Sequence, residues 1–242
     1  MTFRSTSRRR LRLVGLMAIP CWKGIMTSNA RLKLYTENLW DSPYVFTAFV
    51  ALTEKLLPFD AVPLALDRGE QRQSEYRQRS LTAKVPTLVD GDFWLSESSA
   101  IVEYIEERFP PPTHPRLLPA DIRERARARQ VLAWLRTGLA ALRSERPTTS
   151  MFYPRSLPPL SAAGNAAVEK LLRVADQLIP VGATSLFSAW SIADSDLAFM
   201  LHRLILNGKP LPAKIQAFAA TQWQRPSVRA FVEHLRPAAG VP

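Results

Sequence analysis

The sequence has few of the residues that build disulfides and metal sites. Its only cysteine is Cys21, so no disulfide can form within the chain, which fits a reducing compartment. The three histidines, His114, His202 and His234, share no ligand spacing, and no cysteine or carboxylate cluster completes a metal site. No apolar run approaches the roughly 20 residues that a membrane-spanning helix needs. We therefore expect neither a metal cofactor nor a membrane segment.

The chain has 242 residues and a formal net charge of +11, and six of its basic residues lie before residue 26. The rest of the chain has only a small basic surplus, so we expect no nucleic-acid partner. The basic start and the apolar patch Leu13–Ile19 resemble a targeting sequence, but the patch is short and no clean cleavage site follows. We expect residues 1–28 to be a disordered or wrongly assigned N-terminal extension, with Met26 as the working start.

Residues 29–109 show the alternation of strands and helices that is typical of a thioredoxin-like domain. Arg31–Thr36 alternates polar and apolar side chains, which predicts a half-buried strand. Ser42 and Pro43 then favour the start of a helix. Phe59–Leu64 reads as a second strand, which a right-handed crossover would make parallel to the first. The apolar face of the intervening helix is formed by Val45, Phe49, Leu52 and Leu56.

A hairpin and a third helix complete this half. Asp67–Ser80 is polar and Arg-rich, which indicates a loop with a short helix. Val85–Val89 and Asp92–Leu95 are predicted strands around the turn signal Asp90-Gly91. Ser96–Arg108 is a predicted helix.

A proline-rich segment separates this half from a helical one. Four prolines fall between residues 109 and 115, which favours an extended linker over residues 110–116. The rest, residues 117–237, is predicted to be an all-helical domain. Ser191 and Asp194 come close to a capping box at the start of one of its helices. The predicted helices are Ile122–Arg146, Ala162–Leu178, Ile192–Leu206, Pro212–Ala219 and Pro226–Leu235.

Four short motifs, in this order and at these separations, give the chain a family resemblance. They are Ser42-Pro43-Tyr44, Lys84-Val85-Pro86, Glu97-Ser98-Ser99-Ala100-Ile101 and Ser191-Ile192-Ala193-Asp194. Over about residues 30–236 the chain resembles the glutathione S-transferase superfamily, and specifically its bacterial YfcF-type members. The resemblance implies an α/β thioredoxin-like domain followed by an all-helical domain. It also implies glutathione as a co-substrate, no other cofactor, and a homodimer.

Ser42 stands where the family places the group that faces the glutathione thiol. A free thiol with a pKa near 8.5 is only a few per cent ionised at pH 7. A hydroxyl group at a helix N-terminus lowers that pKa through a hydrogen bond and through the helix dipole. A plain helix cap explains Ser42 as well. Tyr35 is the runner-up for the catalytic role, because other transferase classes use a tyrosine at the end of the first strand. A strand aromatic packed into the core is the favoured explanation for it.

The resemblance also places Lys84, Val85 and Pro86 on glutathione. In the family this proline is cis, so the backbone of the preceding residue can pair with the cysteinyl part of the tripeptide. A proline that simply starts a strand is the alternative. Lys84 is one candidate partner for the glycyl carboxylate, and an arginine of residues 68–79 is the other.

Glu97 and Ser98 precede a predicted helix, whose free N–H groups favour an anion. The γ-glutamyl end of glutathione carries a carboxylate and an ammonium group. Ser98 with the helix N-terminus suits the carboxylate, and Glu97 suits the ammonium. Simple helix capping is the alternative.

These residues predict a cytoplasmic glutathione transferase. Its bound thiolate would attack a small electrophile or a hydroperoxide in an apolar cleft between the two halves, a chemistry linked to detoxification and oxidative stress. A glutathione-dependent disulfide reductase and a non-catalytic, transferase-like interaction module are the alternatives. The sequence leaves the identity of the electrophile open.

Overall fold

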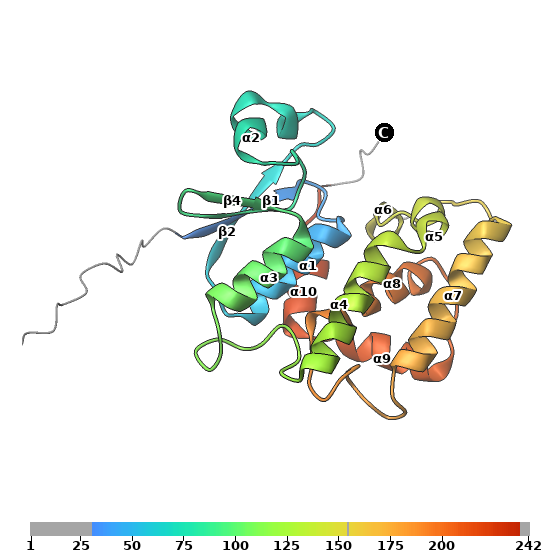
Figure 1. Ribbon diagram of the computed structural model, residues 1–242. Coiled ribbons are helices and arrows are strands. Elements are labelled where there is room, and N and C mark those ends of the chain that lie inside the picture. The colour runs from blue at the N-terminus through green and yellow to red at the C-terminus, as the bar shows by residue number, and fades with distance from the viewer. Residues whose placement is uncertain (1–30, 154, 238–242) are drawn as a thin grey trace, which may run out of the picture.

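A computed structural model describes residues 31–153 and 155–237, so the predicted N-terminal extension and Cys21 lie outside the described residues. The N-terminal half is a four-stranded sheet with helices on its two faces (Figure 1). The strand order is β2-β1-β3-β4, with β2 parallel to β1 and the other pairs antiparallel. Its elements are β1 (Leu32–Glu37), α1 (Pro43–Glu54), β2 (Phe59–Leu64), η1 (Glu70–Arg72), α2 (Ser74–Arg79), β3 (Thr87–Asp90), β4 (Phe93–Ser96) and α3 (Ser98–Arg108).

The alternation along β1 decides which helix covers which face of the sheet. Leu32 and Leu34 are buried in the main hydrophobic core, under α1 and α3. Tyr35 points to the other face, where its ring contacts Tyr76 of α2. Figure 1 shows α1 and α3 side by side on one side of the sheet and α2 beyond the other. The predicted strands and the parallel pairing of β1 with β2 are thus confirmed.

The predicted linker is tied to the N-terminal half by a fully buried lysine. Lys55 follows α1, and its ammonium group lies 2.5 Å from Glu106 Oε2 and donates to the carbonyl of Phe109 at 2.8 Å. The carbonyl of Lys55 in turn lies 2.9 Å from Nδ1 of His114. Both charges of the buried pair are therefore compensated, as a buried ion pair requires.

From Ile122 onward the described elements are helices. They are α4 (Ile122–Thr137), α5 (Ala140–Glu145), α6 (Thr149–Phe152), α7 (Ala162–Leu178), α8 (Ile192–Ile205), α9 (Ala213–Trp223) and α10 (Pro226–Val232). This confirms the predicted class of an α/β thioredoxin-like half followed by an all-helical half. The domain bounds themselves stay a prediction. No helix of the described residues has the length and apolar character needed to cross a membrane.

The prediction of one unbroken helix over Ile122–Arg146 is wrong. The helix ends at Thr137 and restarts at Ala140, because Leu139 has a left-handed backbone with φ +58°. Gly138 lies so close to Trp134 that a Cβ atom would come within 2.9 Å of its indole nitrogen. Arg143 supports the break, because its Nη1 donates to the carbonyls of Leu135 and Gly138. These carbonyls lie at the end of α4, where helix carbonyls lack partners.

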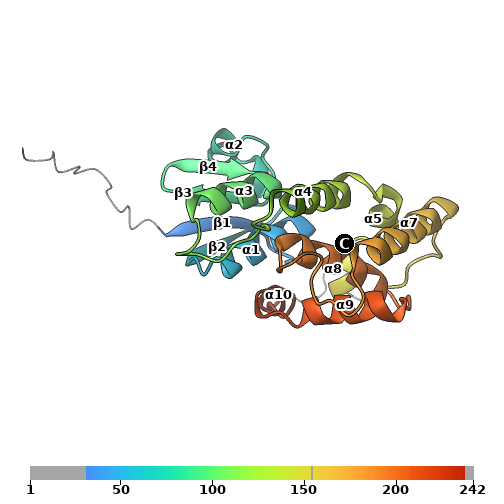
Figure 2. The same ribbon diagram turned by 60° about the horizontal axis from the view of Figure 1, so that its bottom comes forward.

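Helix α8 is the centre of the helical half, and Figure 2 shows it between α4 and α9. Its start confirms the near-capping box. The carboxylate of Asp194 accepts the backbone N–H of Ser191 at 2.8 Å and that of Leu186 at 2.6 Å. A single hydrophobic cluster runs from the sheet of the first half through α1 to α8 and α10. A further contact joins the halves, since Arg225 pairs with Glu54 of α1 at 2.6 Å.

Stability in acid is expected to depend on His202 of α8, which is 5% exposed and stacks on Trp223. Burial lowers its pKa from 6.5 to about 4, so the unfolded chain binds a proton in this range that the folded chain does not. Stability that is present above pH 6.5 is therefore lost as the pH falls through about 4, by up to about 3 kcal/mol. Burial raises the pKa of Glu37 to about 7 and that of Asp194 to about 6, which adds stability as the pH falls. Urea unfolding should therefore show the His202 loss as the difference between the wild type and His202→Phe. Equal acid sensitivity of the two proteins would contradict the assignment.

Candidate active site

All five residues that the sequence placed on glutathione line one pocket. The pocket encloses about 210 Å³ and opens between the loop before β3 and the N-terminus of α3. Two residues that the sequence analysis did not select complete its wall, Tyr44 of α1 and Arg136 of α4. The predicted residues that line it are Lys84, Val85, Pro86, Glu97 and Ser98.

The loop before β3 is held in place by buried hydroxyl groups. The Val85–Pro86 peptide bond is cis, as the family resemblance implied. The phenol of Tyr76 donates to the carbonyl of Lys84 at 2.7 Å, and Thr87 Oγ1 donates to the same carbonyl at 3.0 Å. Helix α2 therefore anchors the backbone that the pocket uses, a role that the sequence pattern of residues 67–80 did not indicate.

Glu97 and Ser98 occupy the N-terminus of α3. Glu97 has a left-handed backbone with φ +73°, although it is not a glycine, and its side chain caps no helix N–H. Its exposed carboxylate is free to meet a ligand, and strained backbone of this kind is typical of functional sites. Ser98 is 3% exposed, and its Oγ lies 3.2 Å from Nη2 of Arg136. The geometry argues against side-chain capping as the explanation for Glu97.

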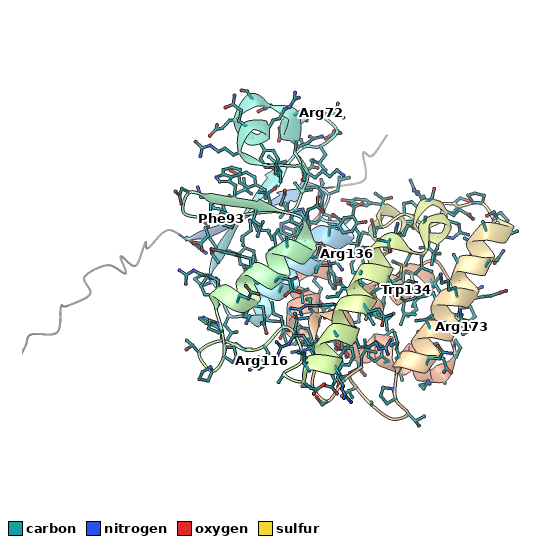
Figure 3. The ribbon with its side chains drawn as sticks, viewed as in Figure 1. Arg72, Phe93, Arg116, Trp134, Arg136 and Arg173 are labelled. Atoms are coloured by element: carbon teal, nitrogen blue, oxygen red, sulfur yellow. The ribbon has the colours of Figure 1, made fainter. Side chains whose placement is uncertain are left out.

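Arg136 links the pocket to the helical half. It comes from the side of α4 that faces α3 (Figure 3), and its guanidinium lies 3.3 Å from Asp196 of α8. Thr47 Oγ1 of α1 donates to the same carboxylate at 2.8 Å. Burial raises the pKa of Asp196, and the nearby Arg136 charge opposes this shift. One buried ion pair therefore fixes the cation that borders the pocket.

Ser42 is the N-cap of α1, as predicted. Its Oγ accepts the backbone N–H groups of Tyr44 and Val45, each at 3.3 Å. A hydroxyl group has two acceptor sites and one hydrogen, so these contacts leave the hydrogen free to donate. The side chain is half-buried and is not itself part of the pocket wall, which α1 enters through Tyr44.

A second, smaller pocket adjoins the first and shares Tyr44 and Arg136 with it. Its surface is mostly apolar, and both halves of the chain contribute to it. Phe46 comes from α1, Leu135 from α4, and Phe199 and Met200 from α8. The predicted apolar cleft between the halves thus has a counterpart beside the polar pocket.

Tyr35 takes part in neither pocket. Its ring lies 5.1 Å from the rings of Tyr76 and Trp94, between β1, α2 and β4. Burial raises the pKa of its phenol, and the charge of Glu75 adds to the shift. Packing on the α2 face of the sheet accounts for this residue.

No group of three or more metal-ligating side chains gathers anywhere in residues 31–153 and 155–237. The histidines have other contacts. His114 bonds to Lys55, and His202 stacks on Trp223. His234 packs against Trp40 with the two rings tilted and their centres 3.7 Å apart.

Comparisons with known proteins place the chain in the glutathione S-transferase family. Residues 38–113 match the model of the glutathione S-transferase N-terminal domain, and residues 121–235 match that of the C-terminal domain. A glutathione transferase homologue from Burkholderia, solved with bound glutathione, is 38% identical with a TM-score of 0.69. The match covers 84% of this chain and 97% of that chain. The chain belongs to this family. Its YfcF-type subgroup stays a prediction.

Two further relatives show how far the similarity reaches. A glutathione S-transferase from Rhodospirillum rubrum is 27% identical with a TM-score of 0.66, over 86% of this chain and 96% of that one. Glutathione S-transferase Z2 of Arabidopsis thaliana is 34% identical over 110 residues, which is 46% of this chain and 47% of the relative. The chain thus spans about half the length of the curated relatives that it matches.

Proposed function

We propose that this protein is a glutathione transferase that binds glutathione in the polar pocket and activates its thiol with Ser42. The observation that carries the proposal is the convergence of Lys84, Val85, Pro86, Glu97 and Ser98 on one pocket. These residues come from two separate segments. The fold brings both segments to the N-terminal end of α1, where Ser42 is the cap residue.

Each part of glutathione has a partner of matching chemistry. The exposed carboxylate of Glu97 receives the γ-glutamyl ammonium group. Ser98, the α3 N-terminus and the guanidinium of Arg136 receive the neighbouring carboxylate. The backbone of Val85 pairs with the cysteinyl residue. Lys84 is our candidate for the glycyl carboxylate, with the arginines of residues 68–79 as the alternative.

Thiol activation follows from where Ser42 lies. Its free hydrogen donates to the thiolate, and the positive end of α1 adds a favourable potential. Lowering the thiol pKa by one unit needs about 1.4 kcal/mol, which one charge-assisted hydrogen bond supplies. The thiolate then forms a bond from sulfur to an electrophilic carbon, whose leaving group departs with the electron pair. With a hydroperoxide, an S–O bond forms as the O–O bond breaks, and the alkoxide leaves with the electron pair and takes a proton. A second glutathione then converts the resulting sulfenic acid into glutathione disulfide and water. The apolar pocket beside Tyr44 encloses only about 30 Å³, so the electrophile or hydroperoxide would lie at its mouth.

The remaining parts of the proposal have indirect support. The Burkholderia homologue with bound glutathione supports glutathione as the co-substrate. A cytoplasmic location and a homodimer, with roles in detoxification and oxidative stress, extend the family resemblance. A disulfide reductase would take its sulfur from bound glutathione. A purely structural interaction module has no use for a polar pocket that gathers both Glu97 and Ser98.

Calorimetry with glutathione tests the proposal. The folded wild type is expected to bind, and Glu97→Gln to bind about tenfold more weakly, because one charge-assisted hydrogen bond is lost. Glu103→Gln is the matched control. It removes a carboxylate from the same helix, where Glu103 pairs with Arg129 on the outer surface, so its affinity should equal that of the wild type. Absence of binding by the folded wild type, or equal affinity of Glu97→Gln, would contradict the proposed site.

A further inference from the structure

Glu37, the last residue of β1, is a buried acid to which the chemistry above gives no role. It is 4% exposed and lines neither pocket. None of the ion pairs formed within residues 31–153 and 155–237 includes it. A carboxyl group buried without a cationic partner is costly, so its contacts point to a specific task.

Those contacts are all with the turn that leads to Ser42. Glu37 Oε1 accepts the backbone N–H of Asp41 at 2.7 Å and that of Ser42 at 2.9 Å. Ser42 Oγ accepts the next two N–H groups, those of Tyr44 and Val45. Pro43 has no N–H, so two side-chain oxygens bind every backbone donor from residue 41 to residue 45. The turn has little freedom to shift while Glu37 is in place.

We propose that Glu37 is a positioning residue that fixes the Ser42 hydroxyl against the glutathione thiol by binding the backbone of Asp41 and Ser42. The proposal rests on the function proposed above, in which Ser42 activates the thiol. Catalytic groups must be held to within about 0.5 Å of their working position. Oε1 of Glu37 supplies this constraint, because it accepts the N–H groups of Asp41 and of the cap residue Ser42.

The protonation state of Glu37 affects thiolate formation beside Ser42. Oε2 is buried and has no hydrogen-bond partner among the described residues. Burial raises the pKa of Glu37 to about 7, and the nearby charge of Asp41 adds to the shift. A negative charge here would disfavour a thiolate beside Ser42. At pH 7 a group with this pKa is about half protonated, and its neutral form avoids that repulsion while the carbonyl oxygen still accepts both N–H groups.

Other charged and titratable groups face this acid from the helical half. Arg236, after α10, and Tyr153, after α6, both interact electrostatically with Glu37 and Asp41. Arg203 of α8 interacts with Asp41. Arg236 is held in place because its guanidinium donates to the carbonyl of Trp40, at 2.8 Å from Nη2. The positioning role proposed for Glu37 depends on its acceptor oxygen and not on its charge.

Two substitutions separate the acceptor from the charge. Glu37→Gln keeps an acceptor oxygen and loses the charge, whereas Glu37→Leu removes the acceptor. We expect Glu37→Gln to keep kcat within about twofold, with a glutathione thiol pKa equal to or below that of the wild type. Glu37→Leu should lower kcat about tenfold and raise the thiol pKa, with the KM for glutathione nearly unchanged. Ultraviolet absorbance of the thiolate and the pH profile of conjugation measure these values.

The control is Glu54→Gln, which removes a half-buried carboxylate at the C-terminal end of α1, where Glu54 binds Arg225 instead of the Ser42 turn. It should leave the thiol pKa unchanged. Amide exchange in the wild type adds a test that needs no variant, since the N–H groups of Asp41 and Ser42 should be protected. Unprotected amides, a Glu37→Leu protein with wild-type kcat and thiol pKa, or equal losses in the Gln and Leu proteins would overturn the inference. Failure of the wild type to bind glutathione would instead overturn the proposed function.

Discussion

Replacing Ser42 with alanine is expected to lower kcat/KM for conjugation about 100-fold, the effect of losing one preorganised donor to a developing anion. The hydroxyl hydrogen that Ser42 keeps free would be gone, so the pKa of the bound thiol should rise toward its free value near 8.5. Spectrophotometric titration of the thiolate in the complex, together with the pH dependence of kcat/KM, measures the change. Glutathione affinity should change little, because the pocket wall does not include Ser42.

The same substitution also removes the cap of α1, which costs about 1 kcal/mol of stability. Ser161→Ala is the matched control, because Ser161 caps α7 by accepting the N–H of Gly164 at 3.0 Å, far along the chain from the pocket. It should cost similar stability and leave the thiol pKa unchanged. A Ser42→Ala protein with the wild-type pH profile would rule out the catalytic role of Ser42.

Replacing Arg136 with methionine is expected to affect both folding and glutathione binding. Asp196 would be left as a buried charge without its cation, which costs about 3–5 kcal/mol of unfolding free energy. Loss of the guanidinium beside Ser98 should weaken glutathione binding about tenfold. Urea unfolding and calorimetry measure the two effects separately.

A double variant separates the contribution of Arg136 to stability from its contribution to glutathione binding. Arg136→Met with Asp196→Asn removes both charges, so much of the lost stability should return while glutathione affinity stays low. Arg127→Met is the control on the same helix, since Arg127 is exposed and bonds to Gln130 one turn away. Full recovery of affinity in the double variant would show that Arg136 does not contact glutathione.

The sequence predicted those parts of the site that are encoded locally. The Ser42-Pro43 start of α1, the loop at Val85-Pro86 and the N-terminus of α3 each depend on a few neighbouring residues with strong conformational preferences. That they serve one ligand is what the resemblance of their order and spacing to the glutathione S-transferase superfamily implied. The polar pocket is where they meet.

The parts that the sequence did not predict depend on contacts between distant segments. Arg136 contacts Asp196, which lies 60 residues further along the chain, and helical periodicity alone gives no sign of this pair. The break at Gly138 follows from the close approach of the Trp134 ring, which apolar spacing does not encode. The predicted strand ends at Thr36, so the sequence pattern assigned Glu37 no role, and its burial depends on packing with the helical half.

The contacts of Lys55 and Glu54 affect which segments can be exchanged between members of this family. The proline-rich stretch is an obvious crossover point, yet His114 within it bonds to the carbonyl of Lys55, directly after α1. Glu54 of α1 in turn pairs with Arg225, directly before α10. A hybrid that joins residues up to 110 to a foreign helical half would keep Glu106 and Phe109 for the Lys55 side chain. It would leave Glu54 without Arg225 and the Lys55 carbonyl without His114. Productive exchanges should therefore transplant α1 together with its receiving helices, as one block.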